Sequence, residues 1–272
     1  MKYAIIGLGY IAERHLRAIK ETGGEVVMAF DKHETGGILD RYFLGAKFPT
    51  HEIEFWNQLR ESGAEYLVIC TPNRHHFEHT QFGLERGMKI ICEKPLTVEY
   101  KDALSLLRNE NVYTILQLRL HPMAQELRNH VAELKRDGEK IYVEVVYNTP
   151  RGSWYHRTWK SVNTNGGILL NIGVHIFDLL IQTFGYPTNA LARTTATESF
   201  AYLSCESADI KVNLSIGTNH LPQRTITVNG TTFDMTVGFD NLHTESYRSI
   251  LNGNGFKVAD ALDAIRLVEE IR

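Results

Sequence analysis

The feature that most constrains the fold is a glycine-rich turn between the first apolar run and the first helical pattern. The string GLGYIA (7–12) follows apolar residues and opens a helix-like segment. Strand and helix patterns then keep alternating, which predicts a doubly wound parallel sheet with helices on both faces. Thr97 is the expected N-cap of the last helix. We predict strands at 2–6, 25–31, 65–71, 88–92 and 112–118, and helices at 11–22, 51–62, 76–86 and 98–110.

Beyond residue 118 the pattern changes to consecutive strands. Short turns join them, and Asn229-Gly230 is typical of a two-residue hairpin. We therefore predict an α/β domain of residues 1–118 and an α+β domain of residues 119–272 with an open, mainly antiparallel sheet. Strands are expected at 141–148, 189–197, 200–204, 210–216, 224–228 and 231–236, and helices at 122–136, 171–184, 244–251 and 257–271.

The composition argues against several classes of function. A net charge of −3 and a pI near 6.5 do not favour a nucleic acid or an anionic membrane as partner. The three cysteines, Cys70, Cys92 and Cys205, lack C-x-x-C spacing and are expected to be reduced, buried thiols. The first apolar run is too short to span a bilayer and lacks a cleavage pattern, so we expect a cytoplasmic protein.

The GLGYIA turn has the G-x-G-x-x-A spacing of a dinucleotide site. Gly7 permits the tight turn, Gly9 lets the backbone approach a pyrophosphate, and Ala12 allows close helix–strand packing. Asp31 ends the second strand, 22 residues after Gly9, where an acid takes the ribose hydroxyls. A carboxylate there favours NAD over NADP. The alternative is a tight turn without a ligand.

Four motifs follow in order: GLGYIA (7–12), TPN (71–73), EKP (93–95) and GGILLNIGVHIFD (166–178). Together they resemble the glucose–fructose oxidoreductase / inositol dehydrogenase / rhizopine-catabolism (Gfo/Idh/MocA) family. The resemblance implies an NAD-binding Rossmann domain, a second domain for substrate binding and oligomerisation, and NAD(P)-linked oxidation or reduction of a sugar-like hydroxyl. The cofactor contacts that it implies are Gly7, Gly9, Tyr10, Ile11, Ala12, Asp31, Thr71, Pro72, Asn73, His76, Glu93, Lys94 and Gln117.

Three further strings, LQLRLHP (116–122), RGSWYHRTWK (151–160) and NIGVH (171–175), resemble one branch of that family. This branch oxidises C3 of UDP-N-acetyl-D-glucosaminuronic acid during the synthesis of lipopolysaccharide O-antigen sugars. The resemblance implies NAD as cofactor, a nucleotide-sugar substrate, a dimer or tetramer, and an aminotransferase of the same pathway as a partner.

Lys94 follows a predicted strand at its carboxyl end, where open α/β sheets bind ligands. Oxidation of a secondary alcohol takes a hydride from carbon and a proton from oxygen, so the protein has to handle the proton. From that position Lys94 could hold the hydroxyl and stabilise developing oxyanion charge. The alternative is a solvated loop lysine.

His175 and Asn171 are four residues apart and would share one face of a helix. A histidine titrates near neutral pH and suits a general base, whereas asparagine can only form hydrogen bonds. Many family members carry aspartate in place of Asn171. The alternative is a histidine packed on an amphipathic helix. Asp178 could orient His175 or bond nearby backbone.

The segment RGSWYHRTWK interleaves cations with aromatic rings, which suits a substrate with a diphosphate and a carboxylate. An aromatic-rich loop that covers the domain junction is the alternative. Gln117 and Arg119 could contact the nicotinamide or a neighbouring subunit. The substrate-binding residues that we predict are Lys94, Arg151, Tyr155, Trp159, Lys160, Asn171 and His175.

No metal is predicted. His75, His76 and His79 lack a carboxylate or cysteine at ligand spacing. Two other functions stay open: an inositol or free-sugar dehydrogenase of the same family, and a non-catalytic NAD(H) sensor. We also expect a homo-oligomer, because an open sheet would otherwise leave one face bare.

Overall fold

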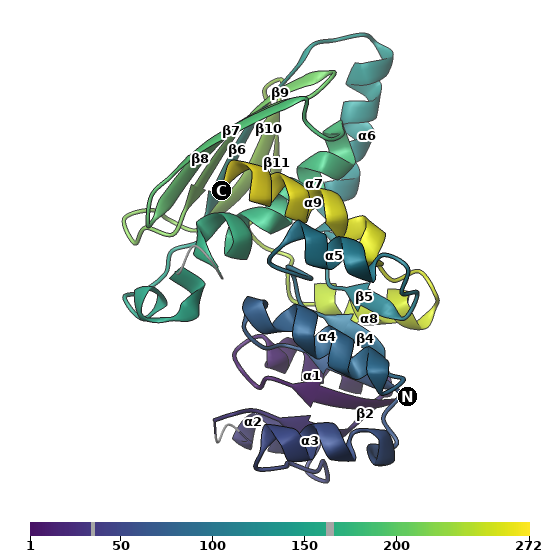
Figure 1. Cartoon of the computed structure of the whole chain (residues 1–272). Coiled ribbons are helices and arrows are strands. Elements are labelled where there is room, and N and C mark those ends of the chain that lie inside the picture. Colours follow the sequence, from purple (N-terminus) through teal and green to yellow (C-terminus); the bar gives the residue numbers. More distant parts are fainter. Residues whose placement is uncertain (34–35, 162–165) are drawn as a thin grey trace. The chain divides into compact units, whose positions relative to one another are not determined.

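The computed structural model describes residues 1–33, 36–161 and 166–272, and the chain forms two compact units (Figure 1). The first unit contains Met1–Gln117 and Asn241–Ala261, and the second contains Leu118–Asp240 and Leu262–Arg272. The sequence predicted one boundary near residue 118. In the structure a later segment, residues 241–261, returns to the first unit.

The first unit is built on a five-stranded parallel sheet in the order β2-β1-β3-β4-β5, as the alternating pattern predicted. Its strands are almost fully buried, because helices cover both faces. The strands are β1 (Lys2–Ile6), β2 (Glu25–Phe30), β3 (Tyr66–Ile69), β4 (Lys89–Cys92) and β5 (Val112–Thr114), and the helices are α1 (Ala12–Glu21), α2 (Gly37–Asp40), α3 (Glu52–Gln58), α4 (His76–Glu85), α5 (Tyr100–Leu106) and α8 (Leu242–Leu251).

The helices divide between the two faces of this sheet. On one face, α1 and α8 pack side by side over Tyr3 and Ile5, and Tyr247 of α8 is fully buried there. On the other face lies α4, whose Gly83 is so close to the sheet that an added Cβ would stand 2.6 Å from Ile90. The returning segment therefore supplies part of the core of the first unit.

Several bounds differ from the prediction. The strand expected at 112–118 ends at Thr114, and Gln117–Leu120 form a 3₁₀ turn instead. The helix expected at 51–62 ends at Gln58, and a 3₁₀ turn follows at Arg60–Ser62. The helix expected at 98–110 is α5, which covers only Tyr100–Leu106. Thr97 was expected to cap it, and this expectation is wrong. The Thr97 hydroxyl instead donates to the carbonyl of Glu99, which occupies the N-cap position without a side-chain bond.

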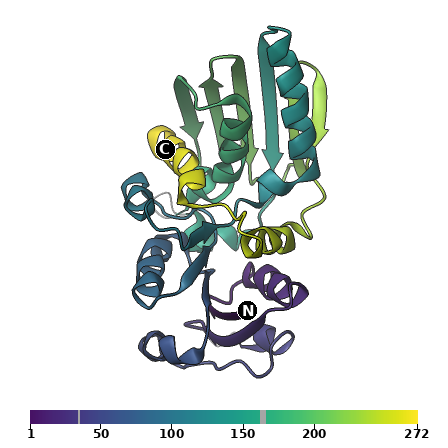
Figure 2. The same cartoon turned by 90° about the vertical axis from the view of Figure 1, so that its right-hand side faces the viewer.

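The second unit contains a six-stranded sheet in the order β11-β10-β6-β9-β8-β7. Neighbouring strands are antiparallel except for the central pair β6 and β9, which is parallel, so the mainly antiparallel sheet is confirmed. Helices α6 and α7 lie over one face (Figure 2). The strands are β6 (Ile141–Asn148), β7 (Asn189–Thr194), β8 (Glu198–Ser204), β9 (Ala208–Ser215), β10 (Gln223–Val228) and β11 (Thr231–Asp234), and the helices are α6 (Pro122–Arg136), α7 (Val174–Phe184) and, continuing from the first unit, α9 (Val258–Ile271).

The face of this sheet opposite α6 and α7 carries large exposed side chains. Burial alternates along β6 and β8, so one face is core and the other is open. Tyr142, Leu191, Phe200 and Tyr202 stand on the open face with 57%, 65%, 54% and 38% exposure. At the edge, Asn229 and Gly230 join β10 to β11 with φ of 45° and 89°, as predicted for the hairpin.

No helix in the described part of the chain combines the length and apolarity needed to cross a bilayer.

Candidate functional site

The turn after β1 has the geometry that its glycines suggested. Gly7 has a φ of +90°, and an added Cβ would lie 2.7 Å from the carbonyl carbon of Cys70, so the fold itself requires glycine there. Gly9 differs, because an added Cβ would meet nothing within 4 Å. Ala12 is fully buried at the start of α1. The open space beside Gly9, at a helix N-terminus, fits the approach of a pyrophosphate.

Asp31 lies just past β2 and is bonded to this turn. Its Oδ2 accepts a hydrogen bond from the Leu8 amide at 2.6 Å, and its Oδ1 accepts one from the His33 amide at 2.8 Å. A carboxylate has further acceptor capacity on both oxygens, so Asp31 can still take ribose hydroxyls. A 2′-phosphate would face this negative charge.

Two more buried polar groups follow β3 and β5, the strands on either side of β4. Asn73, after β3, is 3% exposed and Gln117, after β5, is 5% exposed. Asn73 Nδ2 and Gln117 Oε1 are buried and have no hydrogen-bond partner among the described residues. Because such groups are costly when unsatisfied, they mark where a polar ligand would fit. The first unit therefore fits a dinucleotide.

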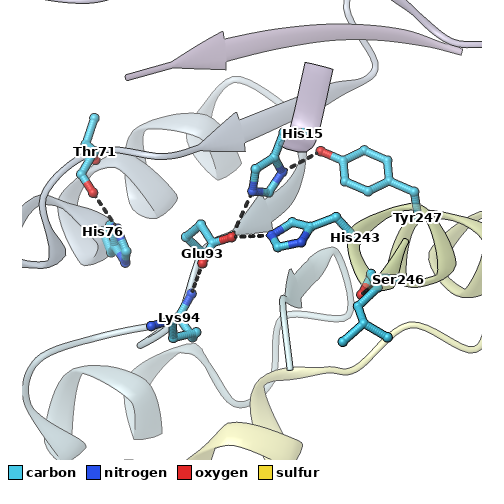
Figure 3. Close-up of polar contacts among 9 residues, drawn as sticks. His15, Thr71, His76, Glu93, Lys94, His243, Ser246 and Tyr247 are labelled. Carbon is cyan, nitrogen blue, oxygen red and sulfur yellow. Dashed lines mark hydrogen bonds and ion pairs between the residues drawn. The ribbon is translucent and has the colours of Figure 1, made fainter. Parts of the chain in front are cut away.

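His76, predicted as a cofactor contact, is held within the protein by two backbone carbonyls. It is 1% exposed, and its ring nitrogens lie 2.7 Å from the Pro95 carbonyl and 2.8 Å from the Thr71 carbonyl. Burial lowers the pKa of the ring, although both carbonyl contacts favour its charged form. His76 thus connects the loop after β3, through Thr71 (Figure 3), to the loop after β4, through Pro95.

Glu93, also predicted as a cofactor contact, is 4% exposed and its carboxylate is engaged within the protein. Its Oε1 lies 2.9 Å from both His15 Nε2 and His243 Nε2, and its Oε2 accepts the Lys94 amide at 3.2 Å. Burial alone would raise the pKa of the carboxyl. The hydrogen bonds from the two histidines outweigh burial and hold this pKa well below its usual range.

Lys94 is half-buried at the carboxyl end of β4, as predicted. Its side chain extends away from the two histidines (Figure 3). The neighbouring residues Cys92, Glu93, Pro95 and Leu96 are all buried. Lys94 is thus the partly exposed residue of an otherwise buried loop.

The second unit gathers most of the predicted substrate residues. Tyr155 is 1% exposed, and its hydroxyl accepts a hydrogen bond from Asn171 Nδ2 at 2.9 Å. Lys160 Nζ lies 5.5 Å from the ring centre of Trp154 and 5.7 Å from that of Trp159. Burial, followed by the charge of Arg151, lowers the pKa of the Lys160 ammonium. A cation between aromatic rings and a bonded tyrosine–amide pair make a surface suited to an anionic, sugar-containing ligand.

Asn171 and His175 lie in one helical stretch with an irregular start. Leu169–Gly173 form a π-helical turn, and α7 follows from Val174. Such turns are frequent at functional sites. Between residues 166 and 181, Asn171 and His175 alone are partly exposed, and all the others are buried.

Asp178 has a partner that the sequence did not suggest. It forms two hydrogen bonds to the Arg119 guanidinium, at 2.8 and 2.6 Å, and both side chains are buried. Arg119 and Asp178 belong to two separate motifs, and His15 and His243 to none, so spacing along the chain could not have revealed these pairings.

The comparisons with known proteins agree with this geometry. A family model described as an oxidoreductase family with an NAD-binding Rossmann fold (GFO_IDH_MocA) matches residues 1–113. The chain is also similar to the WlbA (WbpB) dehydrogenase from Thermus thermophilus, solved in complex with NAD and UDP-GlcNAcA. The identity is 34%, the TM-score is 0.91, and the match covers 98% of this chain and 93% of that one.

Two curated relatives act on other sugars or polyols, according to their names. The D-glucoside 3-dehydrogenase of Escherichia coli K12 is 28% identical, over 45% of this chain and 36% of that protein. The scyllo-inositol 2-dehydrogenase (NADP(+)) IolW of Bacillus subtilis is 25% identical, over 56% of this chain and 44% of that protein. The chain thus spans less than half the length of these curated relatives.

Proposed function

Because the chain belongs to the Gfo/Idh/MocA family of NAD-binding oxidoreductases, we propose that it is an NAD-dependent dehydrogenase of a nucleotide sugar. The substrate is UDP-N-acetyl-D-glucosaminuronic acid, and the product is its 3-keto derivative, in lipopolysaccharide O-antigen synthesis in the cytoplasm. The observation that carries this proposal is the similarity over 98% of the chain to a dehydrogenase solved with NAD and UDP-GlcNAcA.

The first unit binds the cofactor. The turn at Gly7 and Gly9 receives the pyrophosphate, and Asp31 takes the adenosine ribose. Asn73 and Gln117 use their unpartnered buried atoms on the nicotinamide half. Bound NAD⁺ supplies the acceptor for the hydride from C3.

The chain's own residues handle the proton and the oxygen. Lys94 holds the C3 hydroxyl and stabilises negative charge that develops on its oxygen. His175 takes the proton as general base. Asn171 serves as a hydrogen-bonding residue, because an amide does not exchange a proton in this range and is already bonded to Tyr155.

The second unit recognises the nucleotide sugar. Arg151 and Lys160 match the diphosphate and the uronate carboxylate in charge. Trp159 provides a ring surface for the sugar, and the buried Tyr155 acts on the substrate side by holding Asn171 through its hydroxyl. Although burial lowers the pKa of Lys160, the side chain can still meet an anion as an ammonium, because the rings of Trp154 and Trp159 lie beside the Nζ and favour its charged form.

A second candidate is oxidation of an inositol or a free sugar. The names of the curated relatives favour it. It needs neither a diphosphate nor a carboxylate, so Arg151 and Lys160 would have no ligand charge to match.

A single-turnover experiment tests the proposal. Protein, NAD⁺ and UDP-N-acetyl-D-glucosaminuronic acid are mixed in equal amounts, with an aminotransferase and an amino donor to trap the ketone, and the absorbance of NADH is recorded. We expect a rise that grows with the trap and is lost in Lys94→Ala and in His175→Ala.

Lys101→Ala is the matched control, since this lysine is 78% exposed on α5 and pairs with Glu99. It should keep the wild-type trace. Normal turnover in Lys94→Ala would refute the assigned mechanism. Turnover with polyols and none with UDP-sugars would favour the second candidate, and tight NAD binding without any turnover would indicate a sensor.

The open face of the second unit's sheet supports a further part of the proposal, a homodimer or homotetramer. The exposed aromatic and aliphatic side chains on that face would be covered by a second copy of the chain. An aminotransferase of the same pathway would consume the 3-keto product.

A further inference from the structure

A buried cluster in the first unit lies next to Lys94 and has no part in the proposed chemistry. His15 comes from α1, Glu93 from the end of β4, and His243 and Tyr247 from α8 (Figure 3). All four are at most 4% exposed. The two histidine rings meet edge to face with centres 5.0 Å apart. Three segments distant in sequence thus meet at one carboxylate.

The hydrogen bonds assign a proton to each ring. Because Glu93 is a carboxylate that only accepts, each Nε2 that contacts its Oε1 has to be an N–H. The Tyr247 hydroxyl lies 2.9 Å from His15 Nδ1, and burial raises the pKa of Tyr247, so the hydroxyl keeps its proton and can donate it. His243 Nδ1 has no partner in the described part of the chain, and a proton there would be an unsatisfied buried charge.

The two oxygens of Glu93 therefore have separate tasks. Oε1 accepts the hydrogen bonds of both histidines, and these two bonds fix the plane of the carboxylate. Oε2 accepts the backbone N–H of Lys94 at 3.2 Å. A carboxylate held on one side by two donors gives the Lys94 backbone a fixed anchor at the end of β4.

We infer that His15 and His243 are positioning residues that act through Glu93 to place Lys94. This inference rests on the proposed function for the catalytic role of Lys94. It also gives the returning segment, residues 241–261, a place in the site, because α8 supplies His243 directly and Tyr247 through His15.

His15, Glu93 and His243 could also be taken for a metal site, since their ligand atoms lie within 4.8 Å of one another. The observed geometry favours hydrogen bonds. Both histidine–carboxylate distances are 2.9 Å, the length of a charge-assisted hydrogen bond, and no fourth ligand joins the group among the described residues.

Two variants at His243 separate positioning from packing. In His243→Gln the side-chain amide places an N–H where Nε2 was, whereas in His243→Asn the amide reaches only the place of Nδ1. We expect the Asn variant to lose kcat by about 10- to 100-fold, because small displacements of a catalytic group have effects of this size. The Gln variant should recover most of that loss. NAD affinity should stay within a factor of about two in both.

A second readout does not depend on turnover. The lysines are ¹³C-methylated, the Lys94 signal is assigned with Lys94→Arg, and its NMR shift is followed in the complex with NAD. We expect the signal to move in His243→Asn and to return in His243→Gln. An unchanged Lys94 signal in both variants would overturn the inference, as would equal loss of kcat in both.

These readouts keep the two proposals apart. If the wild-type protein turns over no UDP-sugar, the proposed function fails while the Lys94 signal still tests positioning. If turnover is normal in His243→Asn, positioning fails and the dehydrogenase stands. If the purified protein contained one equivalent of zinc and His243→Asn lost it, the three residues would form a metal site and the inferred hydrogen bonds would be wrong.

Discussion

Four buried side chains of the first unit carry protonation states on which the fold depends. Burial lowers the pKa of His76 and of His243, and it lowers the pKa of His79 to about 4 despite an ion pair with Glu52. In the window below 6.5 the unfolded chain therefore binds protons that the folded chain does not. The pKa of Glu93 is lowered as well, so its effect has the same sign: the stability that it contributes is present above its usual value of 4.5 and is lost as the pH falls through the lowered pKa.

The free energy of unfolding should accordingly decrease as the pH falls from 6.5 to about 4. Each histidine that stays neutral in the fold contributes up to about 1.4 kcal/mol per pH unit. Urea unfolding at intervals across this range measures the slope. His79→Asn should make the slope shallower, and a pH-independent free energy of unfolding would contradict the prediction.

Asp31 should decide the choice of cofactor. Asp31→Asn removes the negative charge. It also replaces one carboxylate oxygen by an NH₂ group, which cannot accept the hydrogen bond from the Leu8 amide (2.6 Å) or from the His33 amide (2.8 Å). We expect NAD affinity to fall about tenfold, a change of roughly 1.4 kcal/mol, and the preference over NADP to shrink. Titration calorimetry with both cofactors measures this. Asp40→Asn, at an exposed acid on α2, is the control and should bind both cofactors like the wild type.

Some residue roles could be predicted from the sequence, and others could not. The roles of Gly7 and Asp31 follow from spacing along a strand–turn–helix unit, and such spacing is local. The partners of His15 and Asp178 are tens to hundreds of residues away. No periodicity reports which buried polar groups meet, so the Glu93 cluster and the Arg119–Asp178 pair needed the structure.

Elements with strong local signals have the predicted bounds. Helix α6 begins with Pro122 after its His121 cap, and β6 alternates buried and exposed residues along its length. The π-helical turn at Leu169–Gly173 was not predicted. The stretch GGILLNIGV is almost wholly apolar, so it has no alternation of polar and apolar positions. Without that periodicity, a π-helical turn cannot be distinguished from an α-helical one in the sequence.

The hairpin between β10 and β11 should be sensitive to its second turn residue. Gly230 has a φ of +89°, so Gly230→Ala forces a side chain into the left-handed region at a cost of roughly 1–2 kcal/mol. We expect a lower melting temperature, by about 2–4 °C per kcal/mol. Gly45→Ala is the control, because an added Cβ there meets nothing within 4 Å and its φ is not left-handed. Equal melting temperatures for the two variants would contradict this account.

At the scale of the whole molecule, the two kinds of sheet were predictable and the path of the chain was not. Alternating elements predicted the parallel sheet, and consecutive strands predicted the second, mainly antiparallel one. Residues 241–261 resemble any amphipathic segment that follows a sheet. Their pattern of buried positions does not say which sheet they cover, and in the structure they join the first unit.

Assembly should depend on the open face of the second unit's sheet. Phe200 and Leu191 stand on neighbouring strands of that face with 54% and 65% exposure. We expect Phe200→Lys to convert the oligomer to a monomer, because a charge would have to be buried in the contact. Analytical ultracentrifugation measures the mass. Leu221→Lys, at a residue 84% exposed outside the strands, should leave it unchanged. A wild-type protein that is itself monomeric would contradict the prediction.

The return of residues 241–261 has a consequence for the order in which the protein can fold as it is made. Residues 1–117 leave the ribosome first, but α8, which covers Tyr3 and Ile5 beside α1, is more than a hundred residues behind. At ordinary rates of synthesis this delay is roughly ten seconds. During that time the nascent cofactor-binding part carries an uncovered apolar face, so chaperones have their main opportunity to bind there.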